Sequence, residues 1–161
     1  DNVVVVDLIG SRLEKALAVG ADAVVNAAGE DVAARLTELH GPGKAMWPGK
    51  AGTDIYLDCA GTPAVIDGAL RAAQNGARLG VVAVHKEPVA IDLVNLMANE
   101  ITVIGSMGYP TEIFEVTRDL AANWEKYAVI VSHTFGFDDV EEALVTARTP
   151  GAADKVVVTF D

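Results

Sequence analysis

The chain has 161 residues, of which 51% are hydrophobic and 22% charged, a balance that suits a globular domain with a sizeable core. Its formal net charge of -11 argues against nucleic acid or an anionic membrane surface as a partner. No apolar run approaches the roughly 18 residues that a membrane-spanning helix needs. The single cysteine, Cys59, excludes an intrachain disulfide and fits a reducing, cytoplasmic compartment.

Residues 3–7, VVVVD, are the stretch around which the rest of the chain is organised. Four valines without polar alternation predict a strand buried on both faces, which is typical of a parallel sheet covered by helices. The strand ends in Asp7. In a dinucleotide-binding fold, an acid at the end of the second strand accepts hydrogen bonds from the adenosine ribose and repels a 2′-phosphate. Asp7 therefore favours NAD over NADP.

Two neighbours bear on the alternative that Asp7 only begins a turn and caps the next helix. Ser11 and Glu14 have the S-x-x-E spacing of a capping box, so the helix is predicted to have its own cap. Arg12, at the start of that helix, either reaches the same ribose or the adenosine phosphate, or is a solvated surface arginine.

Strands and helices alternate along the chain. The first predicted helix carries Leu13 and Leu17 on one face and ends at Gly20. Further strands are expected at residues 23–26, 54–58, 78–84, 101–106, 129–135 and 156–160. Further helices are expected at residues 31–39, 62–73 with Thr62 as N-cap, 93–98 capped by Asp92, 111–124 with Phe114, Leu120 and Trp124 inward, and 139–147.

Other candidate features have plain structural interpretations. Residues 41–52, GPGKAMWPGKAG, contain Gly and Lys as a phosphate cradle does, but they lack the G-x-x-x-x-G-K-[ST] spacing and their prolines remove backbone donors. We interpret them as a loop. His85 is a possible proton-transfer residue, but it has no positioned partner in the sequence. Cys59 is interpreted as a packing residue, and no residue is predicted to be a catalytic acid, base or metal ligand.

The alternation predicts an open parallel α/β sheet whose ligand lies at the carboxyl ends of the strands. Those ends carry narrow or polar residues at Asp7, 58–61, 82–84 and 106–108. The segments VVVVDLIGSRLEKALAVGADAVVN, DIYLDCAGT, NGARLGVVAV, ITVIGSMG and DKVVVTF come in an order that resembles the C-terminal half of the zinc-dependent medium-chain alcohol dehydrogenases. That family includes sorbitol, threonine and butanediol dehydrogenases.

The resemblance implies a Rossmann-type doubly wound parallel sheet without its first strand, with residues 1–123 as the NAD-binding domain and 124–161 as the C-terminal part of the catalytic domain. It assigns the adenosine half of NAD to residues that hold the ribose or flank the adenine: Asp7, Leu8, Arg12, Cys59, Ala60 and Thr62. The nicotinamide would be lined by Val82, Ala83, Val84, Ser106 and Met107, and Lys155 would lie near the phosphates. Ala83 stands where the family commonly has glycine.

The implied reaction is hydride transfer between a secondary alcohol or polyol and NAD, with zinc polarising the alcohol oxygen. The family's G-x-G-x-x-G turn and its zinc ligands are not in this sequence, so we expect an N-terminal half to supply both and the 161 residues alone to be inactive. A homo-oligomer, either a dimer or a tetramer, is the family's default. Without the first strand, the strands at 3–7 and 54–58 have unpaired edges, and we expect no stable monomeric sheet.

Three alternatives stay open. Zinc-independent quinone and enoyl reductases share this cofactor domain, although they more often use NADPH, against which Asp7 argues. Methyltransferases that use S-adenosylmethionine also place an acid at the end of the second strand. A non-catalytic nucleotide-sensing module would bind NADH without turnover.

Overall fold

The computed structural model describes residues 2–108 and 111–160, and the chain divides into two compact units. The first unit comprises residues 1–4 and 29–108, and the second comprises residues 5–28 and 109–161. Each unit is α/β with parallel strands, and each is described by itself.

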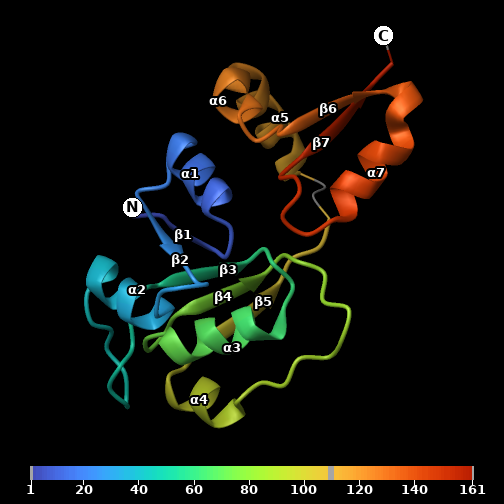
Figure 1. The fold of residues 1–161 in the computed structure, drawn as a ribbon. Helices are drawn as coiled ribbons and strands as arrows, with labels where there is room; N and C mark the ends of the chain where they lie inside the picture. Colours follow the sequence, from blue (N-terminus) through green and yellow to red (C-terminus); the bar gives the residue numbers. More distant parts are fainter. Residues whose placement is uncertain (1, 109–110, 161) are drawn as a thin grey trace. The chain divides into compact units, whose positions relative to one another are not determined.

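The first unit is built on a three-stranded parallel sheet in the order β3-β4-β5 (Figure 1). The strands are β3 (Ile55–Asp58), β4 (Arg78–Val81) and β5 (Thr102–Gly105). The register places Asp58 beside Val81 and Val81 beside Gly105, so all three strands end at the same level. The segments that follow them therefore emerge at one edge of the sheet.

Helices cover one face of this sheet. These are α2 (Val32–His40), α3 (Pro63–Ala72) and α4 (Leu93–Ala98), and Figure 1 shows α3 lying across the strands. Ile66 and Leu70 of α3 pack with Leu79 of β4 in the buried core. On the opposite face Ile55, Leu57 and Ile104 are 60%, 65% and 51% exposed. Within the first unit, the helices thus cover one face of the sheet.

The loop 41–52 is confirmed, closed by a bridge between Pro42 and Ala51. Its Lys50 points inward and is buried, with Nζ donating to the carbonyl oxygen of Arg71 at 2.7 Å and to Oδ1 of Asn95 at 3.0 Å. Burial lowers the pKa of Lys50, and the nearby Asp92 carboxylate opposes that shift. Lys50 therefore satisfies the C-terminal end of α3, and this one of the loop's two lysines is not available to a phosphate.

The second unit contains two pairs of strands. β1 (Val4–Asp7), whose first residue belongs to the first unit, pairs with β2 (Ala23–Asn26) after α1 (Gly10–Ala18). β6 (His133–Gly136) pairs in parallel with β7 (Val156–Thr159) around η1 (Phe137–Asp139) and α7 (Val140–Arg148). The helices α5 (Glu112–Ala122) and α6 (Trp124–Ala128) complete the unit.

Several predicted details are wrong for local reasons. β1 is not buried on both faces, because the side chain of Val6 is 41% exposed. Ser11 is not the N-cap of α1, which begins at Gly10 with Ile9 in the cap position and no capping side chain. The Asp7 carboxylate instead accepts a hydrogen bond from the Ile9 N–H at 2.9 Å, which fixes the turn into the helix.

Later elements also differ from the prediction. Phe114, Leu120 and Trp124 are 66%, 45% and 63% exposed, not inward, and no described residue of α5 or α6 is buried. The strand expected from residue 129 begins at His133, since α6 and a turn occupy the preceding residues. None of the helices at 2–108 and 111–160 is long and apolar enough to cross a membrane.

Candidate functional site

Asp58 is the last residue of β3 and is fully buried. Its Oδ1 accepts hydrogen bonds from the backbone N–H groups of Ala60 at 3.1 Å and Gly61 at 3.0 Å, and its Oδ2 lies 2.6 Å from Nε2 of His85. Burial alone would raise the pKa of Asp58, but the hydrogen bonds from Gly61, His85 and Ala60 outweigh it and hold the pKa below its ordinary value. Asp58 is therefore a buried carboxylate.

The chain leaves β4 at the carbonyl oxygen of Asp58. This oxygen accepts from the N–H group of Val82 at 3.0 Å, which continues the parallel ladder, and also from the N–H group of Ala83 at 2.9 Å, which departs from the ladder pattern. The chain therefore turns away from β3 at Ala83, and the strand does not extend to the predicted Val84. Residues 82–85 form a segment, here called the β4 exit segment, attached to the end of β3.

His85, at the end of the β4 exit segment, has the positioned partner that the sequence did not reveal. Its side chain is 15% exposed, and its Nδ1 is buried without a hydrogen-bond partner among the described residues. The interpretation of His85 as an unpartnered loop histidine was wrong. Since 27 residues separate it from Asp58, only the pairing of β3 with β4 brings the two together.

The predicted nicotinamide residues lie beyond the carboxyl ends of β4 and β5. Val82, Val84 and Met107 are 51%, 82% and 95% exposed, and Ser106 donates its backbone N–H to the carbonyl oxygen of Val81. Because β4 and β5 are adjacent and parallel, these residues share one edge of the sheet. They present an exposed apolar surface there.

The turn after β3 carries the predicted adenosine-side residues of the first unit. Cys59, Ala60 and Thr62 are all exposed, so Cys59 is not the packing residue that we expected. Gly61 has φ +70°, and a Cβ at this position would lie 2.7 Å from the carbonyl oxygen of Val84. The turn and the β4 exit segment are thus in direct backbone contact, which requires glycine.

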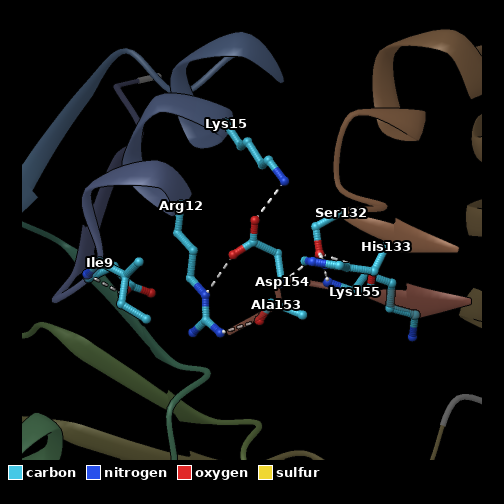
Figure 2. Close-up of polar contacts among 9 residues, drawn as sticks. Ile9, Arg12, Lys15, Ser132, His133, Ala153, Asp154 and Lys155 are labelled. Atoms are coloured by element: carbon cyan, nitrogen blue, oxygen red, sulfur yellow. Dashed lines mark hydrogen bonds and ion pairs between the residues drawn. The ribbon is translucent and has the colours of Figure 1, made fainter. Parts of the chain in front are cut away.

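The predicted residues of the second unit lie around α1 and the start of β7. Asp7 is half-buried at the end of β1, and Leu8 is 65% exposed. Arg12 is not a freely solvated arginine: its Nε lies 3.1 Å from Oδ1 of Asp154, and its Nη2 donates to the carbonyl oxygen of Ala153 at 3.2 Å. Figure 2 shows Arg12 and Lys15 reaching from α1 toward the same carboxylate.

Asp154, the residue before Lys155, forms ion pairs with both Arg12 and Lys15. Lys15 Nζ lies 2.6 Å from Oδ2 of Asp154, and the hydrogen bond from Lys15 leads the interactions that lower the pKa of Asp154. The Ser132 hydroxyl oxygen accepts the backbone N–H groups of Asp154 and Lys155 at 2.9 and 3.2 Å, so this segment is fixed to the start of β6. No local pattern in the sequence indicated this role for Asp154.

The predicted residues form two sets, one on each unit. The first unit carries Cys59, Ala60, Thr62, Val82, Ala83, Val84, Ser106 and Met107, and the second carries Asp7, Leu8, Arg12 and Lys155. Within residues 2–108 and 111–160, no group of three or more His, Cys, Asp or Glu side chains could hold a metal ion.

Residues 2–123 match a family model described as zinc-binding dehydrogenase. The chain belongs to this family. Its relatives include an L-threonine 3-dehydrogenase of Pectobacterium carotovorum, 28% identical over 99% of this chain and 44% of the relative, and a sorbitol dehydrogenase of Rattus norvegicus, 28% identical over 99% and 43%. The chain therefore spans less than half the length of these curated relatives.

Solved structures agree with the fold. A short chain alcohol dehydrogenase from E. coli CFT073, complexed with the cofactor NADH, has a TM-score of 0.77 at 25% identity over 99% of this chain and 45% of its own. An alcohol dehydrogenase of Thermotoga maritima has a TM-score of 0.83 at 19% identity over 98% and 43%. These similarities confirm the α/β fold, and family membership decides against the methyltransferase alternative.

Proposed function

We propose that this chain is the cofactor-binding part of an NAD-dependent alcohol dehydrogenase, acting between a secondary alcohol or polyol and its carbonyl compound. The observation that carries the proposal is Asp7, a half-buried carboxylate at the carboxyl end of β1 in a member of the zinc-binding dehydrogenase family. A carboxylate at this place accepts two ribose hydroxyls and repels a 2′-phosphate. The relatives named for threonine and sorbitol support the substrate class.

The residues of each unit fit one part of the dinucleotide. On the second unit, Asp7 and Arg12 would hold the adenosine ribose, Leu8 would contact the adenine, and Lys155 would face the phosphates. On the first unit, the exposed turn with Cys59, Ala60 and Thr62 would face the adenosine side. The exposed residues Val82, Val84, Ser106 and Met107, together with the half-buried Ala83, would line the nicotinamide, whose flat ring suits their largely apolar surface.

The cofactor supplies the redox chemistry when it is bound: it accepts a hydride from the alcohol carbon while the hydroxyl proton leaves, and a carbonyl results. The described residues do not fit a zinc site, and we derive no step through a metal. A zinc ion is proposed for the whole protein only.

The proposal has three further parts. These are the division of the chain between residues 123 and 124, a homo-oligomeric state and a cytoplasmic location.

The test is cofactor preference, measured by titrating NADH and NADPH into the full polypeptide that carries residues 1–161. We expect tighter binding of NADH, and we expect Asp7→Ala to reduce that preference about tenfold by removing the repulsion of the 2′-phosphate. Glu14→Ala, which removes an exposed carboxylate from α1, is the matched control. A native preference for NADPH would contradict the proposal and favour the quinone or enoyl reductases.

Substrate class is tested separately by following NADH formation with L-threonine, sorbitol and 2R,3R-butanediol. Oxidation of any of these supports the proposal. Tight NADH binding without turnover of any alcohol or ketone would favour the nucleotide-sensing module.

A further inference from the structure

Asp58 connects the turn after β3 to the β4 exit segment through every oxygen it has. Its Oδ1 accepts from the turn at Ala60 and Gly61, its carbonyl oxygen accepts from Val82 and Ala83, and its Oδ2 meets His85. With 0% exposure, Asp58 has no water to replace a lost partner. A buried carboxylate that loses a donor is costly, so the carboxylate of Asp58 favours the conformation in which Ala60, Gly61 and His85 all contact it.

The contacts hold the β4 exit segment at both ends. At the first end, Val82 and Ala83 bond to the backbone oxygen of Asp58, which any substitution retains. At the other end, His85 is held through its side chain, at 2.6 Å from the carboxylate. Val84 lies between, 82% exposed, with its carbonyl oxygen against Gly61. The conformation at Val84 and His85 therefore depends on the Asp58–His85 contact.

We propose that Asp58 and His85 are a positioning pair, which holds the β4 exit segment in the conformation that binds the nicotinamide half of the cofactor. This inference rests on the proposed function, in which Val82 to Val84 line the nicotinamide. The pair acts through the backbone of the segment and touches no reacting atom. Nε2 of His85 carries the proton that it donates to Asp58, and this bond fixes the ring.

If the pair holds only the β4 exit segment, its loss should weaken binding of the nicotinamide half of the cofactor and not of the adenosine half. ADP-ribose contains the adenosine, phosphates and second ribose of NADH but no nicotinamide, so its binding does not need the β4 exit segment. In the full polypeptide, we expect His85→Phe to weaken NADH binding about tenfold and to leave ADP-ribose binding within about twofold, by calorimetric titration. His85→Gln, whose amide can still donate to Asp58, restores NADH binding.

The matched control is His40→Phe. His40 is also a half-buried histidine with one side-chain partner, Oγ1 of Thr53 at 2.7 Å, and Thr53 lies before the opposite end of β3. We expect this variant to bind both ligands as the native protein does. If His85→Phe does not fold, Asp58→Asn replaces it, because this variant keeps Oδ1 for the turn and changes the oxygen that faces His85. We expect a smaller but equally selective loss of NADH binding.

Equal weakening of NADH and ADP-ribose in a folded variant would overturn the inference, since it would indicate a general structural role. Unchanged NADH binding in His85→Phe would also overturn it. A native protein that binds neither ligand would overturn the proposed function together with this inference, which distinguishes the two failures.

Discussion

At the scale of the residue, Asp154 forms two ion pairs within the second unit. It is 16% exposed and pairs with Arg12 and Lys15, whose side chains are 40% and 28% exposed. We expect Asp154→Asn to lower the free energy of unfolding by about 1 kcal/mol at neutral pH, the upper end for a pair that solvent partly screens. Urea denaturation of the full polypeptide measures this change.

The pH dependence of that difference has a definite sign. The pKa of Asp154 is lowered in the folded protein, first by the hydrogen bond from Lys15. Its stabilisation is therefore complete above the unfolded pKa, about 4, and is lost as the pH falls through the lower folded value. The native protein and Asp154→Asn should differ equally from pH 8 to 5 and converge below about pH 4. Asp67→Asn is the control, because its pair with Arg71 is 57% and 77% exposed and contributes little. A difference that persists unchanged at pH 2 would contradict the assignment.

At the scale of the element, two helices begin after a residue type that can cap a helix, but only one of the two residues makes a capping hydrogen bond. The Asp92 carboxylate accepts from the N–H groups of Val94 and Asn95 at 2.9 and 3.1 Å and caps α4. Thr62 occupies the N-cap position of α3, but its side chain makes no capping bond. We expect Asp92→Ala to cost about 1 kcal/mol of stability and Thr62→Ala to cost a few tenths, both measured by denaturation. Equal costs would mean that the observed caps do not decide helix stability here.

The sequence predicted the elements that depend on local signals. Pro63 begins α3, Asp92 caps α4, and Gly20 follows α1 with φ +106°, all as expected from residue type alone. The predictions that failed have different causes. Ser11 lost the N-cap position through a local contact, since Asp7 bonds Ile9 two residues away, whereas β4 ended early because Ala83 bonds Asp58, which is distant in the sequence.

In the candidate site too, features set by local sequence were predictable and contacts between distant residues were not. The strand ends that carry it were predictable, since an unalternating apolar run followed by a polar or small residue marks the carboxyl end of a buried parallel strand. The contacts of Asp58 with His85 and of Arg12 with Asp154 were not, because they join residues 27 and 142 positions apart. Such pairs follow from strand register and from packing within a unit, which no local pattern encodes.

At the scale of the whole molecule, exposed apolar residues and net charge have opposite effects on the association of the chain with other copies. Ile55, Leu57 and Ile104 lie exposed on one face of the β3-β4-β5 sheet, and β3 has β4 as its only strand neighbour in the described structure. Such faces and edges favour association with other chains. The net charge of -11 repels copies of the chain at neutral pH, and that repulsion disappears near the pI of about 4.5.

Residues 1–161 expressed alone should therefore associate, and more strongly as the pH falls from 8 toward 5 or as salt screens the charge. Light scattering coupled to size exclusion measures the mass at each pH. Leu57→Lys places a charge on the exposed sheet face and should reduce the association, whereas Leu144→Lys, at an equally exposed position on α7, should reduce it less. A monomer at every pH that unfolds in one sharp cooperative transition would contradict this prediction, because it would mean that the three strands form a stable sheet with one face uncovered.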